Sequence, residues 1–374
     1  MQAKSQLDHD IIEGVRTFVE REVFPVASDL EHRNEYPQAL VERMKELGLF
    51  GATIPEEFGG LGLSVSTYAR IVEELCRGWM SLSGILNTHL MIAYVIRTFG
   101  NDEQKQRFLP PMARGEKRAA LGLTEAHAGS DAQRIRTTAT RRGDSYYVNG
   151  SKMWSTNART GTMFGLVVKT DPTANPPHKG ISLFLVEAGF PGFVRGRKLD
   201  KLGLRGQDTS ELAFEDCRVP AQNLLGKEGD GFKMLMQQLQ QERVCIGVGS
   251  IASCRRALDD TVRYVKERRA FGQSVASFQN TQFKLVELQT QVEIGQAFVD
   301  KLLAAHVRGE DVVTEVSMAK WWTTDLQKRV TSECLQLHGG YGFMLEYPIS
   351  QDYADAAVQS IYAGTNEIMK VIIA

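Results

Sequence analysis

Apolar residues recur at helical spacing along the first third of the chain. In residues 5–24 they fall three or four positions apart, and the pattern returns in 36–48 and twice within 65–99. Such spacing places apolar side chains on one face of a helix, where they can pack against a core. A shorter, more polar helix is expected at 103–108. We therefore predict a helical N-terminal domain over 1–118.

The pattern changes near residue 118 to short runs rich in β-branched and aromatic residues. Three of these runs are 145–148, 163–168 and 181–186, and turn-forming Gly, Asn, Asp and Pro residues separate them. Because no helical period lies between the runs, neighbouring strands are expected to pair in antiparallel fashion. We predict a middle β-domain over 119–226, built as an antiparallel barrel or sandwich.

Helical spacing returns after Gly231 and continues to the end of the chain. Three long helices are predicted, at 232–266, 280–306 and 314–337. These helices form a predicted C-terminal helical domain over 227–374. No repeat or flexible linker separates the three segments, so we expect one compact body of the α+β class.

The composition is that of a globular protein and excludes several functional classes. Hydrophobic residues make up 43% and charged residues 24%, which excludes disordered and collagen-like chains. With 44 basic and 45 acidic residues, the chain lacks the basic excess of a dedicated nucleic-acid binder. No apolar run reaches the roughly 18 residues of a membrane span. The N-terminal residues lack the features of a targeting signal, so we expect a cytoplasmic bacterial protein, with the mitochondrial matrix as the alternative.

The cysteines give no sign of a disulfide framework or a metal site. They are odd in number, scattered, and without a C-x-x-C pair: Cys76, Cys217, Cys245, Cys254 and Cys334. The histidines do not pair with them at the spacing of metal ligands. We therefore expect reduced, buried thiols and no structural metal.

Residues 247–252 fit the G-x-G-x-x-A spacing of dinucleotide-binding loops. That fingerprint requires a strand before it and a helix that begins at it. Here the segment lies inside the predicted helix 232–266. We interpret its small residues as a place where two helices pack closely.

Glu242 is a candidate general base. Its carboxylate shares one face of the predicted helix with Leu235, Leu239 and Ile246. A carboxylate on an apolar face is partly desolvated, which raises its pKa and suits it to accept a proton. The alternative is that Glu242 lies at the edge of this face and pairs with Arg243 or a neighbouring helix.

Two segments of the β-region combine hydroxyl groups with glycine or tryptophan. The loop 124–131 follows a predicted strand and offers hydroxyls and backbone N–H groups, which can hold a phosphate or the edge of a flavin. The segment 154–156 places an aromatic ring beside two hydroxyls. The alternatives are an ordinary turn for the loop and a core position for Trp154.

Six ordered segments resemble the motifs of one family, the acyl-CoA dehydrogenases, and they span essentially the whole chain. The matching segments are 58–60, 123–131, 152–157, 267–272 with Gln279, 336–342, and 362–367. The resemblance implies a helical N-terminal domain, a middle β-domain and a C-terminal four-helix bundle. It also implies FAD, bound between the β-domain and the bundle.

The resemblance assigns cofactor contacts to two groups of residues. Contacts on one subunit are implied for Leu123, Thr124, Gly129, Ser130, Trp154 and Thr156, with Thr365 and Glu367 nearby. Contacts across a subunit interface are implied for Arg268, Phe271, Gln279, Gln336 and Gly340. The second group implies a homotetramer, arranged as a dimer of dimers.

The implied chemistry is the α,β-dehydrogenation of an acyl-CoA thioester to a trans-2-enoyl-CoA, as in fatty-acid β-oxidation. A carboxylate takes the α-proton, the β-hydrogen leaves as hydride to FAD, and the electrons pass to electron-transferring flavoprotein. Most members carry the base where this chain has Ala363, which cannot take a proton. The long-chain and isovaleryl branches carry it instead on an earlier helix, at the position that Glu242 matches.

The resemblance gives three further residues a place near the substrate. The backbone N–H of Ala363 is implied to bind the thioester oxygen, Arg243 to lie near the CoA moiety, and Tyr362 to lie against the thioester. The alternatives are a helix-surface salt bridge for Arg243 and core packing for Tyr362. Two alternative functions stay open: an acyl-CoA oxidase, or a catalytically impaired subunit that binds FAD and acyl-CoA.

Overall fold

The computed structural model of this chain describes residues 2–374, with side chains from residue 6 onward. Helices fill the N-terminal part, as the apolar spacing predicted. They are α1 (Gln2–Phe18), α2 (Ala27–His32), α3 (Gln38–Glu46), α4 (Val65–Gly78), α5 (Met80–Phe99) and α6 (Asp102–Ala113), with a π-helical turn at Val19–Val23. Local sequence sets their ends: the Ser64 side chain caps α4, and Asn101 and Gln104 form a capping box that starts α6.

The middle part of the chain forms an eight-stranded sheet. Its strands are β1 (Ala119–Gly122), β2 (Thr138–Arg142), β3 (Ser145–Ser155), β4 (Met163–Lys169), β5 (Ile181–Glu187), β6 (Phe193–Lys198), β7 (Ser210–Pro220) and β8 (Leu224–Leu225). They lie in the order β6-β7-β3-β2-β4-β5-β8, and β1 pairs with β4.

Two pairings in this sheet differ from the antiparallel arrangement that the sequence predicted. β1 and β2 each run parallel to β4, whereas the remaining pairs are antiparallel. Parallel neighbours require a long connection between them. The β2–β3 hairpin supplies it, because it lies in the chain between β1 and β4 and returns the chain to the same end of the sheet.

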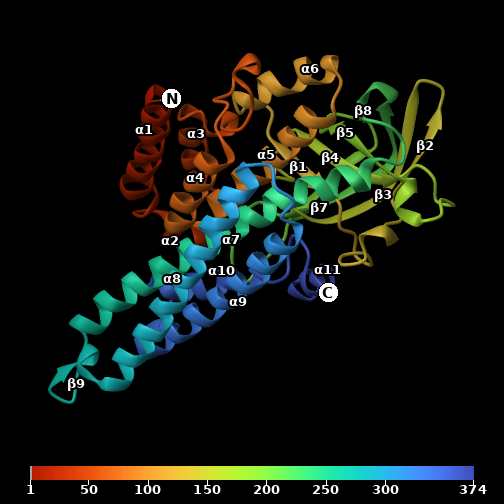
Figure 1. Cartoon of the computed structure of the whole chain (residues 1–374). Helices are drawn as coiled ribbons and strands as arrows, with labels where there is room; N and C mark the ends of the chain where they lie inside the picture. Colours follow the sequence, from red (N-terminus) through yellow and green to blue (C-terminus); the bar gives the residue numbers. More distant parts are fainter. Residues whose placement is uncertain (1) are drawn as a thin grey trace.

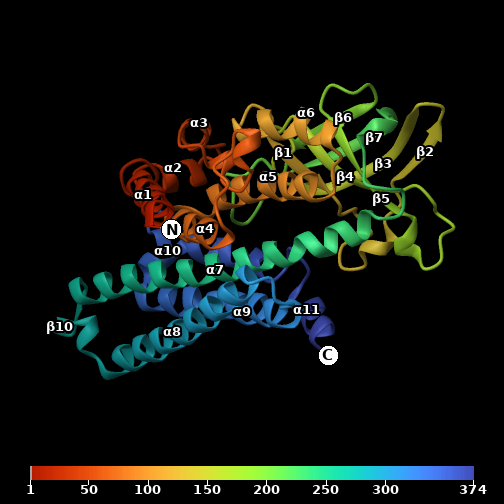
Figure 2. The same cartoon turned by 45° about the horizontal axis from the view of Figure 1, so that its top comes forward.

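The C-terminal part is a bundle built around one long helix. Its helices are α7 (Gly231–Glu267), α8 (Gln279–Val307), α9 (Val313–His338), α10 (Pro348–Gln359) and α11 (Asn366–Ile373), and a small hairpin of β9 (Arg269–Ala270) and β10 (Gln273–Ser274) joins α7 to α8. Figures 1 and 2 show α7 between the N-terminal helices on one side and α8 and α9 on the other. This central position makes α7 the element that both halves of the molecule share.

The glycine-rich segment 247–252 lies inside α7 and serves helix packing, as interpreted from the sequence. A Cβ atom at Gly249 would stand 2.7 Å from the Sγ atom of Cys76 on α4. Only a residue without a side chain lets the two helices approach this closely. The five cysteines are all buried and unpaired, as expected.

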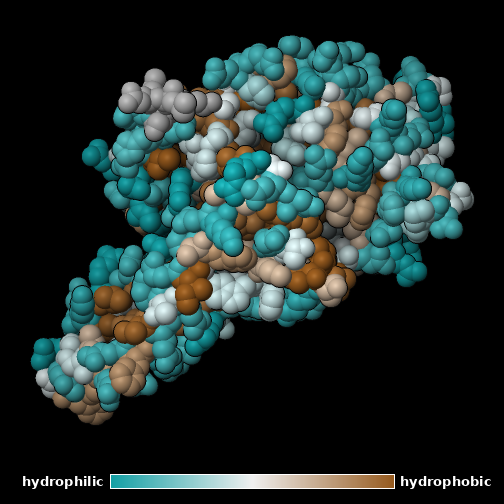
Figure 3. Space-filling view, in the orientation of Figure 1, coloured by the Kyte–Doolittle hydropathy of each residue, from teal (hydrophilic) through white to brown (hydrophobic). Residues whose placement is uncertain are grey.

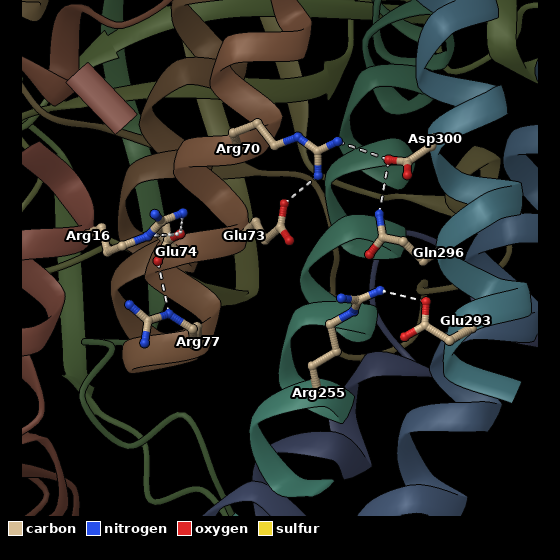
Figure 4. Close-up of polar contacts among 9 residues, drawn as sticks. All are labelled: Arg16, Arg70, Glu73, Glu74, Arg77, Arg255, Glu293, Gln296 and Asp300. Atoms are coloured by element: carbon tan, nitrogen blue, oxygen red, sulfur yellow. Dashed lines mark hydrogen bonds and ion pairs between the residues drawn. The ribbon is translucent and has the colours of Figure 1, made fainter. Parts of the chain in front are cut away.

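Two ion pairs join α4 to neighbouring helices, one to α1 and one to α8. Figure 4 shows Glu74 reaching Arg16 of α1, with 2.8 Å between Nη2 and Oε1, and Arg70 reaching Asp300 of α8 at 3.0 Å. The Arg70–Asp300 pair is exposed on both sides and contributes only about 0–1 kcal/mol to stability, whereas Glu74 is buried. Their effect is therefore mainly to fix the orientation of α4, whose other face turns toward α5 and α7.

The surface is mostly hydrophilic, but apolar patches appear along the arm formed by the bundle (Figure 3). Large apolar side chains exposed there include Phe271, Phe283, Val286, Ile294 and Phe343. No helix within residues 2–374 is both long enough and apolar enough to cross a membrane.

Candidate active site

A narrow cavity of about 90 Å³ lies where α4, α5 and α7 meet. Its apolar part is formed by Cys76, Met80, Cys245 and Ile246. Gly84 and Gly249 also line it, and each packs so closely against Gln207 or Cys76 that a side chain would not fit there. Polar side chains make up the rest of the lining: Ser83, Asn87, Thr88, Thr156, Gln207, Glu242, Gln359 and Tyr362. The cavity can therefore hold an apolar chain that ends at a polar, reactive group.

Glu242 is the ionisable group of this cavity. Leu235, Leu239 and Ile246 on the same face of α7 are buried, as the sequence pattern predicted. Burial raises the pKa of Glu242 from 4.5 to about 7, against hydrogen bonds from Asn87 and Gln238 that lower it. A carboxylate with this pKa is partly ionised near neutral pH and holds few water molecules, as a general base requires.

The partner of Glu242 on the neighbouring helix is a neutral amide rather than a cation. The Nδ2 atom of Asn87 on α5 donates to Oε2 of Glu242 at 2.8 Å, and the hydroxyl of Tyr68 on α4 donates to Oδ1 of Asn87 at 2.9 Å. Neither contact is apparent from the sequence, because the Asn87–Glu242 contact joins residues 155 positions apart and the Tyr68–Asn87 contact joins two different helices. The small or polar residues spaced along α5 were the only signal.

Two buried cations donate hydrogen bonds to backbone oxygens of the loop that follows α10. Nε of Arg243 donates to the backbone oxygen of Ala363 at 3.1 Å. Nζ of Lys320 donates to the backbone oxygen of Gly364 at 2.8 Å and to Oδ1 of Asn366 at 3.0 Å. Burial lowers the pKa of Lys320 to about 8. Arg243 is buried too, so the alternative of a helix-surface salt bridge is wrong.

These contacts leave three backbone donors of the loop without an acceptor among the described residues: the N–H groups of Ala363, Gly364 and Thr365. Ala363 has a φ of +52° and Gly364 a φ of +90°, so the chain turns sharply there. Within the described chain, the backbone N–H of Ala363 has no hydrogen-bond acceptor. Tyr362, the residue before Ala363, lines the same cavity as Glu242, so the free N–H of Ala363 lies next to that cavity in the chain. Such a donor can stabilise negative charge that develops on a bound oxygen.

Tyr362 lies in the cavity wall rather than in a closed core. Its hydroxyl donates to Oε1 of Gln359 at 2.6 Å, and about a third of its surface is exposed. Thr365 begins α11, where its side chain accepts a hydrogen bond from the N–H of Ile368. Glu367 is exposed in the first turn of that helix.

A buried ion pair holds the loop 123–131. Nζ of Lys152 lies 2.7 Å from Oε1 of Glu125, and both side chains are almost fully buried. The same Nζ atom donates to the backbone oxygen of Leu123, and the N–H of Met153 donates to the backbone oxygen of Thr124. Burial acts to raise the pKa of Glu125, but the charge and hydrogen bond of Lys152 hold it below its ordinary value.

Exposed groups of the loop 123–131 and of the segment 154–156 fit a flat, polar ring system. Trp154 is 56% exposed and has a φ of +55°, so the alternative of a core position is wrong. Gly129 and Ser130 are exposed, and only the methyl carbon of Thr124 comes within 4 Å of a Cβ placed on Gly129. Thr156 joins this surface to the cavity through its contact with Gln207.

The second group of sequence-predicted cofactor residues lies at the other end of the bundle. Arg268, Gln336 and Gly340 line a cavity of about 410 Å³ that also contains aromatic side chains. Phe271 is 95% exposed, and Gln279 is the first residue of α8. In Figure 1 this end is the tip marked by β9.

The structure therefore separates the predicted residues into two groups. Glu242 and Arg268 lie 26 positions apart along α7, which is about 39 Å at 1.5 Å per residue. One cofactor molecule cannot contact both groups within a chain. Among the described residues, no three His, Cys, Asp or Glu side chains gather as metal ligands would.

Comparison with known proteins covers almost the whole chain. Models of the N-terminal, middle and C-terminal domains of acyl-CoA dehydrogenase match residues 5–116, 120–217 and 229–374. A mouse protein named long-chain specific acyl-CoA dehydrogenase, mitochondrial, is 44% identical over 98% of this chain and 86% of its own length.

Two solved structures show the same fold. An acyl-CoA dehydrogenase from Geobacillus kaustophilus is 46% identical and superimposes with a TM-score of 0.95, covering 98% of this chain and 96% of its own. A chain from a structure described as the electron transferring flavoprotein of Acidaminococcus fermentans is 36% identical, with a TM-score of 0.94 and the same coverage.

Proposed function

The chain belongs to the acyl-CoA dehydrogenase family, and on that premise we propose that it converts an acyl-CoA thioester to the trans-2-enoyl-CoA. The observation that carries this proposal is the placement of Glu242. Its carboxylate lies in an apolar cavity, has a pKa raised to about 7, and shares the site with a free backbone N–H. These are the two groups that removal of a weakly acidic α-proton requires.

In the proposed mechanism, Glu242 takes the α-proton while the N–H of Ala363 binds the thioester oxygen. Negative charge grows on that oxygen as the proton leaves. Arg243 and Lys320 hold the two carbonyl groups of the Ala363–Gly364 turn, and so keep the N–H directed into the site. Tyr362, in the cavity wall, is proposed to lie against the thioester, and Arg243 near the CoA moiety. Glu242 can fill the role of base even though alanine occupies position 363.

FAD is the cofactor that we propose, and the exposed groups of the β-domain fit it. An exposed Trp154 ring, the open space at Gly129 and the hydroxyls of Thr124, Ser130 and Thr156 offer a flat contact and polar donors together. Leu123, Thr365 and Glu367 complete the proposed set on this side. When bound, FAD supplies the hydride acceptor for the β-hydrogen.

A neighbouring subunit is proposed to complete each FAD site. Support comes from the distance of about 39 Å between Glu242 and Arg268, which places the second group of cofactor residues out of reach within one chain. That group is Arg268, Phe271, Gln279, Gln336 and Gly340. The exposed apolar side chains along the bundle support burial against other copies. We propose a homotetramer, a dimer of dimers.

Electron-transferring flavoprotein is the proposed electron acceptor. The likeness to a chain from a structure described under that name supports this partner. The alternative acceptor, oxygen, would make the protein an acyl-CoA oxidase. The cytoplasmic location expected from the sequence stays a prediction.

We propose the domain boundaries 1–118, 119–226 and 227–374. Support comes from the change of secondary structure between the end of α6 and the start of β1, and again between the end of β8 and the start of α7.

Anaerobic mixing with acyl-CoA thioesters tests the proposed function. The bound flavin is expected to bleach with at least one of octanoyl-, palmitoyl- and isovaleryl-CoA, and the panel ranks the acyl chains. Bleaching is expected to be lost in Glu242→Gln, which keeps the shape of the side chain but cannot take a proton. Failure of every thioester to bleach the unmutated holoprotein would support the impaired subunit instead. Peroxide release in air during turnover would support the oxidase.

A further inference from the structure

We propose that Asn87, oriented by the hydroxyl of Tyr68, is a positioning residue that holds one carboxylate oxygen of Glu242 and leaves the other free for the substrate proton. This inference rests on the proposed role of Glu242 as the base. It adds two residues that touch neither the thioester nor the cofactor in the proposed mechanism.

The direction of the two hydrogen bonds fixes which end of the amide faces the base. The Tyr68 hydroxyl donates to Oδ1 of Asn87, so the NH₂ group must point at Oε2 of Glu242. The reversed amide would place an oxygen against a carboxylate oxygen, and two acceptors cannot bond to each other. The ionised carboxylate therefore selects this amide orientation, and the Tyr68 hydroxyl stabilises it by donating to Oδ1.

Three helices carry the three residues, and α4 is fixed from outside. Tyr68 is fully buried, and its neighbours on α4, Arg70 and Glu74, are tied to α8 and α1 by the ion pairs in Figure 4. Residues two positions apart on a helix face away from each other. The Arg70 pair thus holds α4 from the surface while Tyr68 reaches inward to Asn87.

A neutral donor suits this position better than a cation. Hydrogen bonds to a charged group are stronger than those between neutral groups, so the amide restrains Oε2 firmly. It adds no positive charge, so Glu242 keeps the basicity that burial gives it. Gln238, one turn before Glu242 on α7, also lowers the pKa of Glu242. Among the described residues the hydrogen bond to the carboxylate is the one from Asn87 to Oε2, so Oε1 is left as the oxygen that takes the proton.

The other ionisable groups around Glu242 do not compete for this role. They are Arg243 and Cys245 on α7, Cys76 and Tyr68 on α4, and Tyr362 after α10. The pKa values of both thiols and both phenols are raised, mainly by burial, so these groups stay neutral near pH 7. Arg243 is engaged with the backbone oxygen of Ala363.

Two variants separate positioning from packing. Asn87→Leu keeps the approximate volume and removes the donor. Tyr68→Phe removes one buried hydroxyl and leaves Asn87 free to rotate its amide. Tyr94→Phe is the matched control, because Tyr94 lies on α5 but outside the cavity.

The first measurement follows the carboxyl group itself by infrared difference spectroscopy over a pH series. The holoprotein is used without substrate, and Glu242→Gln supplies the blank spectrum. Losing a hydrogen bond to a charged group is expected to raise the titration midpoint of Glu242 by about one pH unit in Asn87→Leu. Tyr68→Phe should move it in the same direction by less, and Tyr94→Phe should leave it unchanged.

The second measurement is single-turnover flavin reduction by an acyl-CoA. If the midpoint moves from about 7 to about 8, roughly one-tenth instead of one-half of Glu242 is ionised at pH 7, a rate loss of about fivefold that disappears at higher pH. The substrate concentration for half-maximal rate should change little. A purely structural role would lower the melting temperature without moving the midpoint.

An unchanged midpoint in both variants overturns the inference. If Asn87→Leu does not fold, Tyr68→Phe alone decides, since it removes a single oxygen atom. Failure of the proposed function is seen separately, because the infrared titration needs no substrate and reports on Glu242 even when no acyl-CoA bleaches the flavin.

Discussion

Replacing the proposed base should make the protein more stable while abolishing its activity. Glu242→Gln keeps the size of the side chain and its contact with Asn87, but it cannot ionise. Burial raises the pKa of Glu242 from 4.5 to about 7, a difference that corresponds to about 3 kcal/mol at 1.36 kcal/mol per pH unit. The free energy of unfolding is therefore about 3 kcal/mol lower when the carboxyl group of Glu242 is ionised than when it is protonated.

The sign of the effect depends on pH. A carboxyl group whose pKa is raised by folding contributes its full stability below about pH 4.5, and that contribution is lost as the pH rises through about 7. Glutamine has no such loss. The variant should therefore match the unmutated protein at pH 4.5 and exceed it by up to about 3 kcal/mol at pH 8.

Thermal unfolding at a series of pH values measures this difference. For 374 residues the unfolding entropy is about 0.8 kcal/mol/K, so a gain of about 3 kcal/mol raises the melting temperature by about 4 °C. A gain of equal size at pH 5 and pH 8 would show that packing, not ionisation, is responsible. No gain at pH 8 would refute the reasoning that burial raises the pKa of Glu242.

Three further predictions concern the supports of the site. Lys320→Met leaves the oxygens of Gly364 and Asn366 without their donor, so flavin reduction should slow by about tenfold or more in stopped-flow measurements; an unchanged rate would contradict a role in holding the turn. Glu125→Gln removes one partner of a buried ion pair and should lower the stability of the folded protein around the loop 123–131 by about 3–5 kcal/mol. Because this loop is proposed to contact FAD, the purified variant should have a lower flavin-to-protein ratio. Full flavin content would contradict this prediction. Gly249→Val places a side chain within 2.7 Å of the Sγ atom of Cys76 and forces α4 and α7 apart, so thermal unfolding should show a loss of about 1–3 kcal/mol in stability; an unchanged melting temperature would contradict the role of Gly249 in close packing of the two helices.

The parts of the fold that depend on local spacing could be predicted from the sequence. The helix predicted at 232–266 is observed at Gly231–Glu267, and the apolar face that carries Glu242 is buried as expected. The parallel pairing of β1 with β4 could not be predicted, because it depends on where the β2–β3 hairpin returns the chain. Alternating residues specify a strand but not the direction of its neighbour.

In the site, too, features of a single helix could be predicted from the sequence, whereas contacts between distant segments could not. Periodicity on one helix singled out Glu242, whereas its partner Asn87 lies 155 positions earlier and has no spacing relation to it. The contact of Lys320 with Gly364 spans 44 positions and has no spacing relation either. The exposure of Trp154 follows from a positive φ that its residue type does not favour, so neither composition nor spacing indicates it.

The length of α7 has a consequence for the protein in dilute solution. Glu242 lies in the first half of this helix and Arg268 directly follows its last residue, so each complete site would draw on two places about 39 Å apart along the helix, in two copies of the chain. Cofactor retention then becomes linked to assembly by mass action: dilution that separates the copies weakens FAD binding, and added FAD opposes the separation. A chain in which Glu242 is replaced would still supply Arg268 to the FAD site of a neighbouring copy whose Glu242 is intact. Mixed assemblies of two differently inactivated chains should therefore regain part of the activity that neither has alone.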